Sequence, residues 1–357
     1  MITSFIPRVL ERYIAIDHAC GWPNLTVLPD GDLVVLVWPE PTHGQCEGAI
    51  ESWGSSDGGR TWTKRGVPVP YTPGTNRMNH STGLDRDGTL VAIVSGWEDR
   101  LPKGSKVSHL NSNTVAAIPA RSADGGITWV PGKSPEPSAD SLAIYSTGQK
   151  DKSGRTRPMM IPFGDIHPLG DDLLGSMFYS RRAEFYVSSD KGISWAMRGS
   201  LGDIDGTNET TWLPLPDGRL LAAARTLGDQ HLEQYISDDQ GRTWNYDQDL
   251  TGAACHPAGL TALADGTLLL TYSIRTDPLQ GIGAKISRDQ GKTWSEQQVL
   301  VDLERSSNDT DEAPEWRDGG YPSNVQLADG TIVTAYYCKG VAAHQRYHVG
   351  VLRWRMD

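Results

Sequence analysis

The sequence predicts an all-β protein, a six-bladed β-propeller of four-stranded antiparallel blades formed by a single domain over residues 1–357. Three observations predict this fold. An eight-residue motif occurs five times, an Asp-Gly motif recurs between its copies, and turn residues are abundant. The chain holds 39 Gly, 22 Pro and 12 Trp against only 4 Phe, which is typical of many short strands joined by turns.

The first motif is Ser-x-Asp-x-Gly-x-Thr/Ser-Trp, found at residues 55–62, 122–129, 188–195, 237–244 and 287–294. Repetition of the same fixed positions indicates a structural repeat. Ser and Asp side chains bond backbone N–H groups in tight turns, Gly adopts a positive φ, and Trp buries a large ring. Each copy is therefore expected to be a hairpin turn anchored by its tryptophan.

The second motif is Asp-Gly between apolar segments, the strongest short hairpin signal. It occurs at residues 30–31, 87–88, 217–218, 265–266 and 329–330, with a weaker copy at Asp171-Asp172. Five of these six turns are followed by the first motif 19 to 37 residues later, counted Asp to Asp. This order predicts six antiparallel sheets whose radial arrangement protects their edges. A β-sandwich or a solenoid is the alternative.

The sixth unit lacks the first motif. Residues 347–354 are expected to form its third strand, and residues 9–16 could supply the fourth. Pairing of these two segments would join the chain termini in one sheet and close the ring.

Composition limits the function classes. A net charge of −11 argues against nucleic acid as a partner, because phosphate binding needs a basic surface. No apolar run is long enough for a transmembrane helix, so no membrane partner is expected. The first residues lack a basic head followed by an apolar stretch, which argues against a secretory signal. The localisation stays open between cytoplasmic and exported with a removed signal, and so does the oligomeric state.

The four cysteines have neither paired nor metal-type spacing. Cys20, Cys46, Cys255 and Cys338 are scattered along the chain. Neither a disulfide framework nor a zinc site is predicted from them. We expect buried thiols, no cofactor and no metal site.

The Asp-Gly turns locate a pocket. Equivalent positions of a radial repeat converge on its axis, so residues at one fixed distance from each turn should line one cavity. Eight residues before the first residue of each turn the chain has Trp22, Asn79, Phe163, Glu209, Pro257 and Tyr321. Polar residues at the same level are His80, Asp165, His256 and Asp318. Fold alone assigns no chemistry to this wall.

The two interleaved motifs resemble those of the sialidase superfamily over nearly the whole chain. Residues 208–225 resemble the segment that carries the catalytic glutamate and one carboxylate-binding arginine, and residues 320–333 resemble the segment with the nucleophilic tyrosine. The resemblance implies that Tyr321 attacks the anomeric carbon, that Glu209 takes its proton and that Arg225 binds an acidic group. A carboxylate beside a phenol supplies the base that the weak nucleophile needs.

The general acid is predicted from the stretch before the first copy of the eight-residue motif. Residues 43–55 resemble the stretch where sialidases carry an aspartate, and Glu47 is the candidate acid. An ordinary solvated carboxylate is the alternative for this residue.

The arginines depart from the family pattern. Sialidases open the first blade with Arg-Ile-Pro, whereas this chain has Gly21-Trp22-Pro23. Arg275 is near the expected position in the fifth blade but out of register, and Arg317, beside Asp318, is a further cation. We expect these residues and Trp22 to bind substrate. Because a bidentate arginine suits a carboxylate best, the missing arginine leaves recognition of sialic acid open.

Three histidines, His80, His167 and His256, fall at predicted strand starts. Pocket histidines occur in sialidase-like propellers that act on uronate or rhamnose polymers, so these side chains are expected to bind substrate or to exchange protons. A hydrogen-bonded wall residue is the alternative for each.

The leading hypothesis is an exo-acting sialidase-like glycoside hydrolase that removes a terminal, acidic sugar from a glycan. The first alternative is a polysaccharide lyase or a histidine-dependent glycosidase acting on uronate- or rhamnose-containing glycans. The second is a propeller that binds glycans without catalysis.

Overall fold

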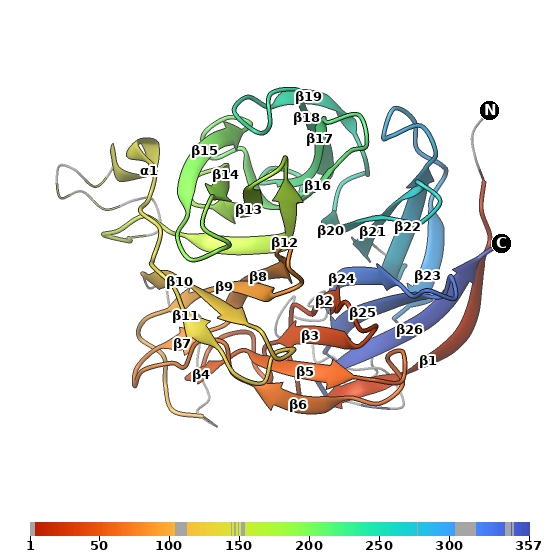
Figure 1. Ribbon diagram of the computed structural model, residues 1–357, viewed down its shortest axis with the longest axis horizontal. Coiled ribbons are helices and arrows are strands. Elements are labelled where there is room, and N and C mark those ends of the chain that lie inside the picture. Colours follow the sequence, from red (N-terminus) through yellow and green to blue (C-terminus); the bar gives the residue numbers. More distant parts are fainter. Residues whose placement is uncertain are drawn as a thin grey trace.

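The computed structural model describes residues 4–103, 113–143, 145, 148, 150, 154–276, 278–303, 319–339, 344 and 346–357. It is an all-β structure with one short helix in the described part, α1 (Ala139–Ala143). Figure 1 shows small sheets arranged around a common middle. No helix in these described ranges is long and apolar enough to cross a membrane.

Four of the sheets have four strands each, with antiparallel neighbours throughout. In spatial order they are β2(Asn24–Val27)-β3(Leu33–Val37)-β5(Glu51–Ser55)-β6(Thr63–Gly66), β16(Thr207–Pro214)-β17(Leu220–Thr226)-β18(Leu232–Ser237)-β19(Asn245–Asp249), β20(Cys255–Ala262)-β21(Leu268–Arg275)-β22(Gln280–Ser287)-β23(Gln298–Asp302), and β1(Pro7–Asp17)-β26(His348–Met356)-β25(Ile332–Cys338)-β24(Gly319–Gln326).

A fifth sheet has eight strands and consists of two antiparallel ribbons of four. The first ribbon is β11(Val130–Pro131)-β10(Thr114–Ser122)-β9(Leu90–Trp97)-β8(Asn79–Leu84), and the second is β12(Ile161–Leu169)-β13(Leu173–Tyr179)-β14(Ala183–Ser188)-β15(Ala196–Leu201). A short parallel contact between β8 and β12 joins them, with Asp165 opposite Thr82. Two short strands, β4(Gly48–Ala49) and β7(Asn76–Arg77), pair in parallel.

One edge strand of each four-stranded group lies toward the middle of the molecule, namely β2, β8, β12, β16, β20 or β24. These strands contact one another in a closed succession, β2 with β8, β8 with β12, β12 with β16, β16 with β20, β20 with β24, and β24 with β2. Figure 1 shows them around one centre. The residues at their starts therefore face a common space, as the radial repeat predicted.

The chain termini meet in one sheet. Strand β1 pairs with β26 along nearly its full length, from Pro7 opposite Met356 to Asp17 opposite His348. The expected segment 9–16 lies in β1, and the expected segment 347–354 lies in β26 except for Tyr347, which precedes the strand. Because β26 also pairs with β25, the N-terminal strand completes a sheet built otherwise from the end of the chain.

The copies of the eight-residue motif form turns of the expected kind. In the copy at 237–244, the buried Ser237 hydroxyl accepts a hydrogen bond from the Gly241 backbone N–H at 2.8 Å, and Asp239 accepts one from the Thr243 N–H at 2.9 Å. Gly241 has a φ of +84°. The Trp244 indole N–H donates to the Gly241 carbonyl at 3.2 Å. The tryptophans of the first four copies bond their own turns in this way, whereas Trp294 donates to Gln234 Oε1 at 2.9 Å.

The core lies between neighbouring sheets. The ring of Phe185 on β14 packs against Trp212 of β16 with centroids 4.8 Å apart, and against Trp244 at 5.5 Å. Such aromatic contacts join one sheet to the next. The four cysteines are buried, as the sequence predicted.

Candidate active site

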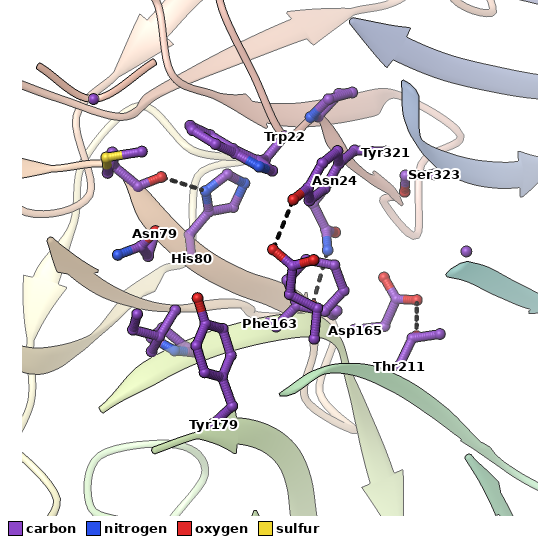
Figure 2. Close-up of a pocket in the computed structure, with 18 of the residues that line it drawn as sticks. Trp22, Asn24, Asn79, His80, Phe163, Asp165, Tyr179, Thr211, Tyr321 and Ser323 are labelled. Atoms are coloured by element: carbon purple, nitrogen blue, oxygen red, sulfur yellow. Dashed lines mark hydrogen bonds between the residues drawn. The ribbon is translucent and has the colours of Figure 1, made fainter. Parts of the chain in front are cut away.

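A cavity opens where the inner strands begin, and Figure 2 shows its main residues. The starts of β8, β12, β16, β20 and β24 and the segment that leads into β2 supply most of its wall. The lining residues are Trp22, Pro23, Asn24, His43, Gly44, Gln45, Met78, Asn79, His80, Trp97, Arg100, Ile161, Pro162, Phe163, Gly164, Asp165, Tyr179, Glu209, Thr211, Ala258, Gly259, Tyr321, Pro322 and Ser323.

Tyr321 and Glu209 meet inside this cavity. The Tyr321 hydroxyl donates a hydrogen bond of 2.7 Å to Glu209 Oε1, although the two residues are 112 positions apart in the chain. On the other carboxylate oxygen, Oε2, Glu209 accepts a hydrogen bond of 2.5 Å from Arg225 Nη1. All three side chains are largely buried. The carboxylate is thus oriented from both sides, with one oxygen turned to the phenol.

The charges around Tyr321 keep its phenol protonated at rest. Burial raises the pKa of Tyr321 above its ordinary value and the charge of Glu209 raises it further, while Arg225 and Arg275 act in the opposite direction. Burial lowers the pKa of Arg225, but the charge and hydrogen bond of Glu209 and the nearby tyrosines Tyr321 and Tyr179 together outweigh this, so its pKa is raised and it stays a cation. A nucleophilic Tyr321 must therefore pass its proton to Glu209 as it attacks.

The backbone at the cavity is strained at two aromatic residues. Tyr321 has a φ of +49° and Trp22 a φ of +41°, a region that bulky side chains rarely occupy and that clusters at functional sites. The Tyr321 backbone N–H donates to Ser273 Oγ at 2.9 Å. The same hydroxyl would lie 1.9 Å from a Cβ placed on Gly320, so this glycine is needed for the close approach that holds Tyr321.

Aromatic rings surround the Tyr321 side chain. Its ring centroid lies 5.8 Å from Trp22, 6.0 Å from Phe163 and 5.7 Å from Tyr337. Trp22 thus lines the cavity as predicted, where it contacts the candidate nucleophile directly. These walls restrict the directions from which a substrate can reach the phenol.

Of the three predicted histidines, His80 lines the cavity, whereas His167 and His256 are not among its lining residues. His80 is buried, and burial lowers its pKa to about 4, so its ring is neutral. The His167 ring packs on Trp212 with centroids 5.3 Å apart. Burial and the charge of Arg275 lower the pKa of His256 to about 2. The latter two side chains are therefore packed outside the lining of the cavity.

The arginines take different places. Arg225 bonds Glu209, as described. Arg275 Nη2 donates to the Gly319 carbonyl at 2.9 Å, with its guanidinium 5.4 Å from the Tyr321 ring centroid, and it does not line the cavity. Gly21 has a φ of +114°, a conformation that an arginine would rarely adopt. Arg317 and Asp318 lie outside the described residues.

The predicted acid Glu47 lies outside the cavity, whereas the acidic residue Asp165 lines it. The Glu47 carboxylate accepts a hydrogen bond of 2.5 Å from the Gly74 backbone N–H, and Glu47 is not among the lining residues. Asp165 does line the cavity, and burial raises its pKa to about 7. Thr211 Oγ1 lies 3.4 Å from its carboxylate. Asp165 and Glu209 are the carboxylates that line the cavity in the described part of the chain.

Sequence reasoning missed a second set of lining residues. Trp97 and Tyr179 stand at the ends of β9 and β13, Arg100 follows Trp97 closely, and His43 lies beyond β3. Counting back from the Asp-Gly turns reaches only the start of each inner strand. Counting forward along the next strand, which returns to the same end of the sheet, would have reached Trp97 and Tyr179.

Comparison with known proteins identifies a matching family and a curated relative. A family model described as "BNR repeat-like domain" matches residues 72–334. A sialidase of Micromonospora viridifaciens is 26% identical over 286 residues, which are 72% of this chain and 42% of that protein. The chain therefore spans less than half the length of this curated relative.

Solved structures show the same fold at low sequence identity. A Dyadobacter fermentans protein of unknown function superposes with a TM-score of 0.77 at 20% identity, covering 98% of this chain and 99% of its own. The Hadza microbial sialidase Hz136 gives a TM-score of 0.66 at 20% identity, covering 96% of this chain and 66% of its own.

Fold and motifs together define a member of the sialidase superfamily, as the sequence resemblance predicted. Since the family model covers most of the chain, this protein belongs to the BNR repeat-like domain family.

Proposed function

We propose that this chain is a six-bladed propeller over residues 1–357 and a retaining, exo-acting glycoside hydrolase with Tyr321 as nucleophile. The ring of contacts between the inner strands supports the propeller. The observation that carries the enzymatic proposal is the 2.7 Å hydrogen bond from the Tyr321 hydroxyl to a Glu209 carboxylate that Arg225 holds on its other oxygen. In this proposal a nucleophile and its base meet in one cavity, and a cation outside the lining orients the base.

In the first step Tyr321 Oη bonds to the anomeric carbon while the bond from that carbon to the leaving oxygen breaks. The phenolic proton passes to Glu209 Oε1 along the existing hydrogen bond. Before the step the negative charge is on Glu209, and afterwards the protonated Glu209 and the glycosylated tyrosine are both neutral. Arg225 stabilises the carboxylate of Glu209 and orients Oε1, the oxygen that faces Tyr321.

We assign the general acid to Asp165, because it lines the cavity and Glu47 does not. A carboxyl whose burial raises its pKa to about 7 carries a proton in about half of the molecules at pH 7 and can give it to the leaving oxygen. In the second step water attacks the anomeric carbon and returns a proton to Asp165. The departing tyrosine oxygen recovers its proton from Glu209, which restores the starting state.

The substrate that we propose is a terminal sugar of a glycan. Arg100 is the arginine among the described lining residues. Its guanidinium would be the cation that contacts the acidic group of a sugar. Asn24, Asn79 and Gln45 offer neutral polar groups that suit hydroxyls. We do not propose that three arginines bind a substrate carboxylate. Gly21 occupies the position of one of them, and its backbone conformation disfavours other residues.

The decisive experiment is a panel of sialyl, uronyl, rhamnosyl and arabinosyl aryl glycosides with three proteins. We expect wild type to hydrolyse at least one of them and Tyr321→Phe to be slower by roughly 10³-fold or more, since the nucleophile is gone. Tyr272→Phe is the matched control, because it removes a buried hydroxyl that bonds Gln297 away from the cavity.

Three results would contradict the proposal. Turnover by Tyr321→Phe at the wild-type rate would show that Tyr321 is not the nucleophile. An unsaturated, ultraviolet-absorbing product would show that the reaction is elimination and not hydrolysis. Glycan binding without turnover on any substrate would favour a binding propeller.

A further inference from the structure

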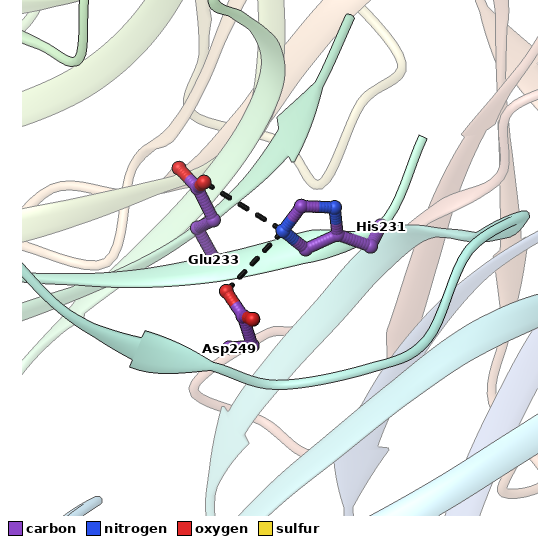
Figure 3. A group of neighbouring side chains, drawn as sticks. All are labelled: His231, Glu233 and Asp249. Carbon is purple, nitrogen blue, oxygen red and sulfur yellow. Dashed lines mark ion pairs between the residues drawn. The ribbon is translucent and has the colours of Figure 1, made fainter. Parts of the chain in front are cut away.

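We infer that this protein has a site for a divalent transition-metal ion of the zinc class at the outer strands of the β16–β19 sheet. Its ligands are His231, Glu233 and Asp249, which we call the His231 cluster (Figure 3). No metal site is expected from the cysteine spacing or from the histidines at the inner strands. The His231 cluster involves neither group of residues.

Strand pairing brings these side chains together. His231 immediately precedes β18, Glu233 is the second residue of β18, and Asp249 is the last residue of β19. Glu233 and Asp249 are directly opposite one another in the antiparallel ladder, so their side chains share one face. The donor atoms of all three residues lie within 4.8 Å of one another.

The spacing suits a tetrahedral ion. His231 Nε2 lies 3.3 Å from Asp249 Oδ1 and 3.6 Å from Glu233 Oε1. Ligands about 2.1 Å from a tetrahedral zinc ion lie about 3.4 Å from one another. The separations therefore match those of ligands around one ion, with the fourth position left for water.

The imidazole is oriented for such a role. His231 Nδ1 bonds the Asp229 carboxylate, an arrangement that accompanies most metal-ligating histidines. Within the described residues, Nε2 is fully buried and has no hydrogen-bond partner. A buried nitrogen that faces two carboxylates is a position at which a cation would be held.

The local charge also calls for a cation. Asp229, Glu233 and Asp249 place three carboxylates around one imidazole, and among the described residues none of them forms an ion pair with a lysine or an arginine. Tyr235 donates to Glu233 Oε2 at 2.7 Å and Tyr246 to Asp249 Oδ1 at 3.2 Å. These phenols orient the carboxylates without neutralising them.

The donor set selects the class of ion. One imidazole nitrogen with two carboxylate oxygens suits zinc or a neighbouring first-row metal, whereas calcium and magnesium prefer oxygen ligands alone. The bound ion would fasten the ends of β18 and β19 to the turn at residues 226–231. That turn directly follows Arg225, and Arg225 is opposite Leu232 in the ladder.

The test uses the full chain after removal of metals with a chelator, titrated with Zn²⁺ or Ca²⁺ alone and followed by calorimetry and by the melting temperature. We expect one saturable Zn²⁺ site per chain, a higher Tm with Zn²⁺, and much weaker Ca²⁺ binding. Asp249→Asn and Glu233→Gln should each weaken Zn²⁺ binding by roughly tenfold or more, by loss of a ligand.

Asp249 is well exposed, so its variant should fold even if Glu233→Gln does not. Asp217→Asn is the matched control, since it removes a carboxylate from the turn at the other end of the same sheet and should leave Zn²⁺ affinity unchanged.

Absence of saturable Zn²⁺ binding would overturn the inference, and so would wild-type affinity in both cluster variants or Ca²⁺ binding as tight as Zn²⁺ binding. These readouts need no substrate, so they stand whether or not the glycosidase proposal holds.

Discussion

The most informative perturbation is Asp165→Asn, because the structure predicts opposite effects on activity and on stability. Asp165 lines the cavity, and burial raises its pKa from 3.8 to about 7. In the folded protein the ionised form is therefore disfavoured, whereas in the unfolded chain it is solvated. Asparagine has nearly the same shape and carries no charge to bury.

The sign of the pH effect follows from linkage. The pKa of Asp165 is higher in the folded protein than in the unfolded chain, so between these two values the carboxyl is ionised only after unfolding. Ionisation then stabilises the unfolded chain. The resulting loss of stability grows as pH rises toward 7 and then levels off. A difference of about three pKa units corresponds to about 4 kcal/mol at pH 8 and to less than about 2 kcal/mol at pH 5. Asp165→Asn should thus be more stable than wild type, and more so at pH 8 than at pH 5.

Activity should change in the other direction. As general acid, Asp165 must be protonated, so wild-type kcat/KM should fall as pH rises through about 7. In Asp165→Asn this limb should disappear, and hydrolysis of substrates with poor leaving groups should slow by roughly 10²–10⁴-fold. An aryl glycoside with a very good leaving group should be affected much less.

The assays are urea denaturation at pH 5 and pH 8, and rate profiles on two leaving groups. Asp85→Asn is a suitable control, since the buried Asp85 carboxylate accepts a bond of 2.7 Å from Arg121 and its loss should destabilise the protein. Equal destabilisation of Asp165→Asn at both pH values would contradict the raised pKa of the Asp165 carboxyl. An unchanged rate profile would remove Asp165 as the acid.

Two further predictions concern the base and the turns. Glu209→Gln leaves the Arg225 cation buried without its partner, so we expect a loss of about 3–5 kcal/mol in unfolding free energy together with a loss of turnover, both measured on the same preparation. A variant as stable as wild type would show that the ion pair contributes little. Ser237→Ala removes the acceptor of the buried Gly241 N–H and should cost about 1–3 kcal/mol with kcat unchanged. A loss of activity without a loss of stability would contradict the structural role of this turn.

The repeated motifs allowed much of the architecture to be predicted. Turn chemistry is local, because serine, aspartate and glycine act within a few residues, so the turn at 237–244 could be predicted in detail. The same periodicity placed Glu209 and Tyr321 at equivalent positions of different strands. In the structure they form a hydrogen bond across 112 residues.

Other site residues could not be predicted, for a physical reason in each case. Glu47 and Asp165 are both acidic residues near predicted strands, and only the packing of surrounding loops and sheets decides which carboxylate lines the cavity. Tyr179 and Arg100 reach the cavity from positions outside the repeat that was counted. The His231 cluster depends on cross-strand register, which sequence spacing does not show.

By itself, then, the sequence determined what is local and periodic, namely the turns, the strand order and the register of the inner strand starts. It also determined the absence of an arginine at Gly21, whose positive φ explains why glycine is found there. Only the tertiary structure decided burial and charge pairing, because both depend on which distant side chains share a space that excludes water. That is why Tyr321, Glu209 and Arg225 become one hydrogen-bonded group, and why Asp165 becomes a carboxyl whose pKa is raised.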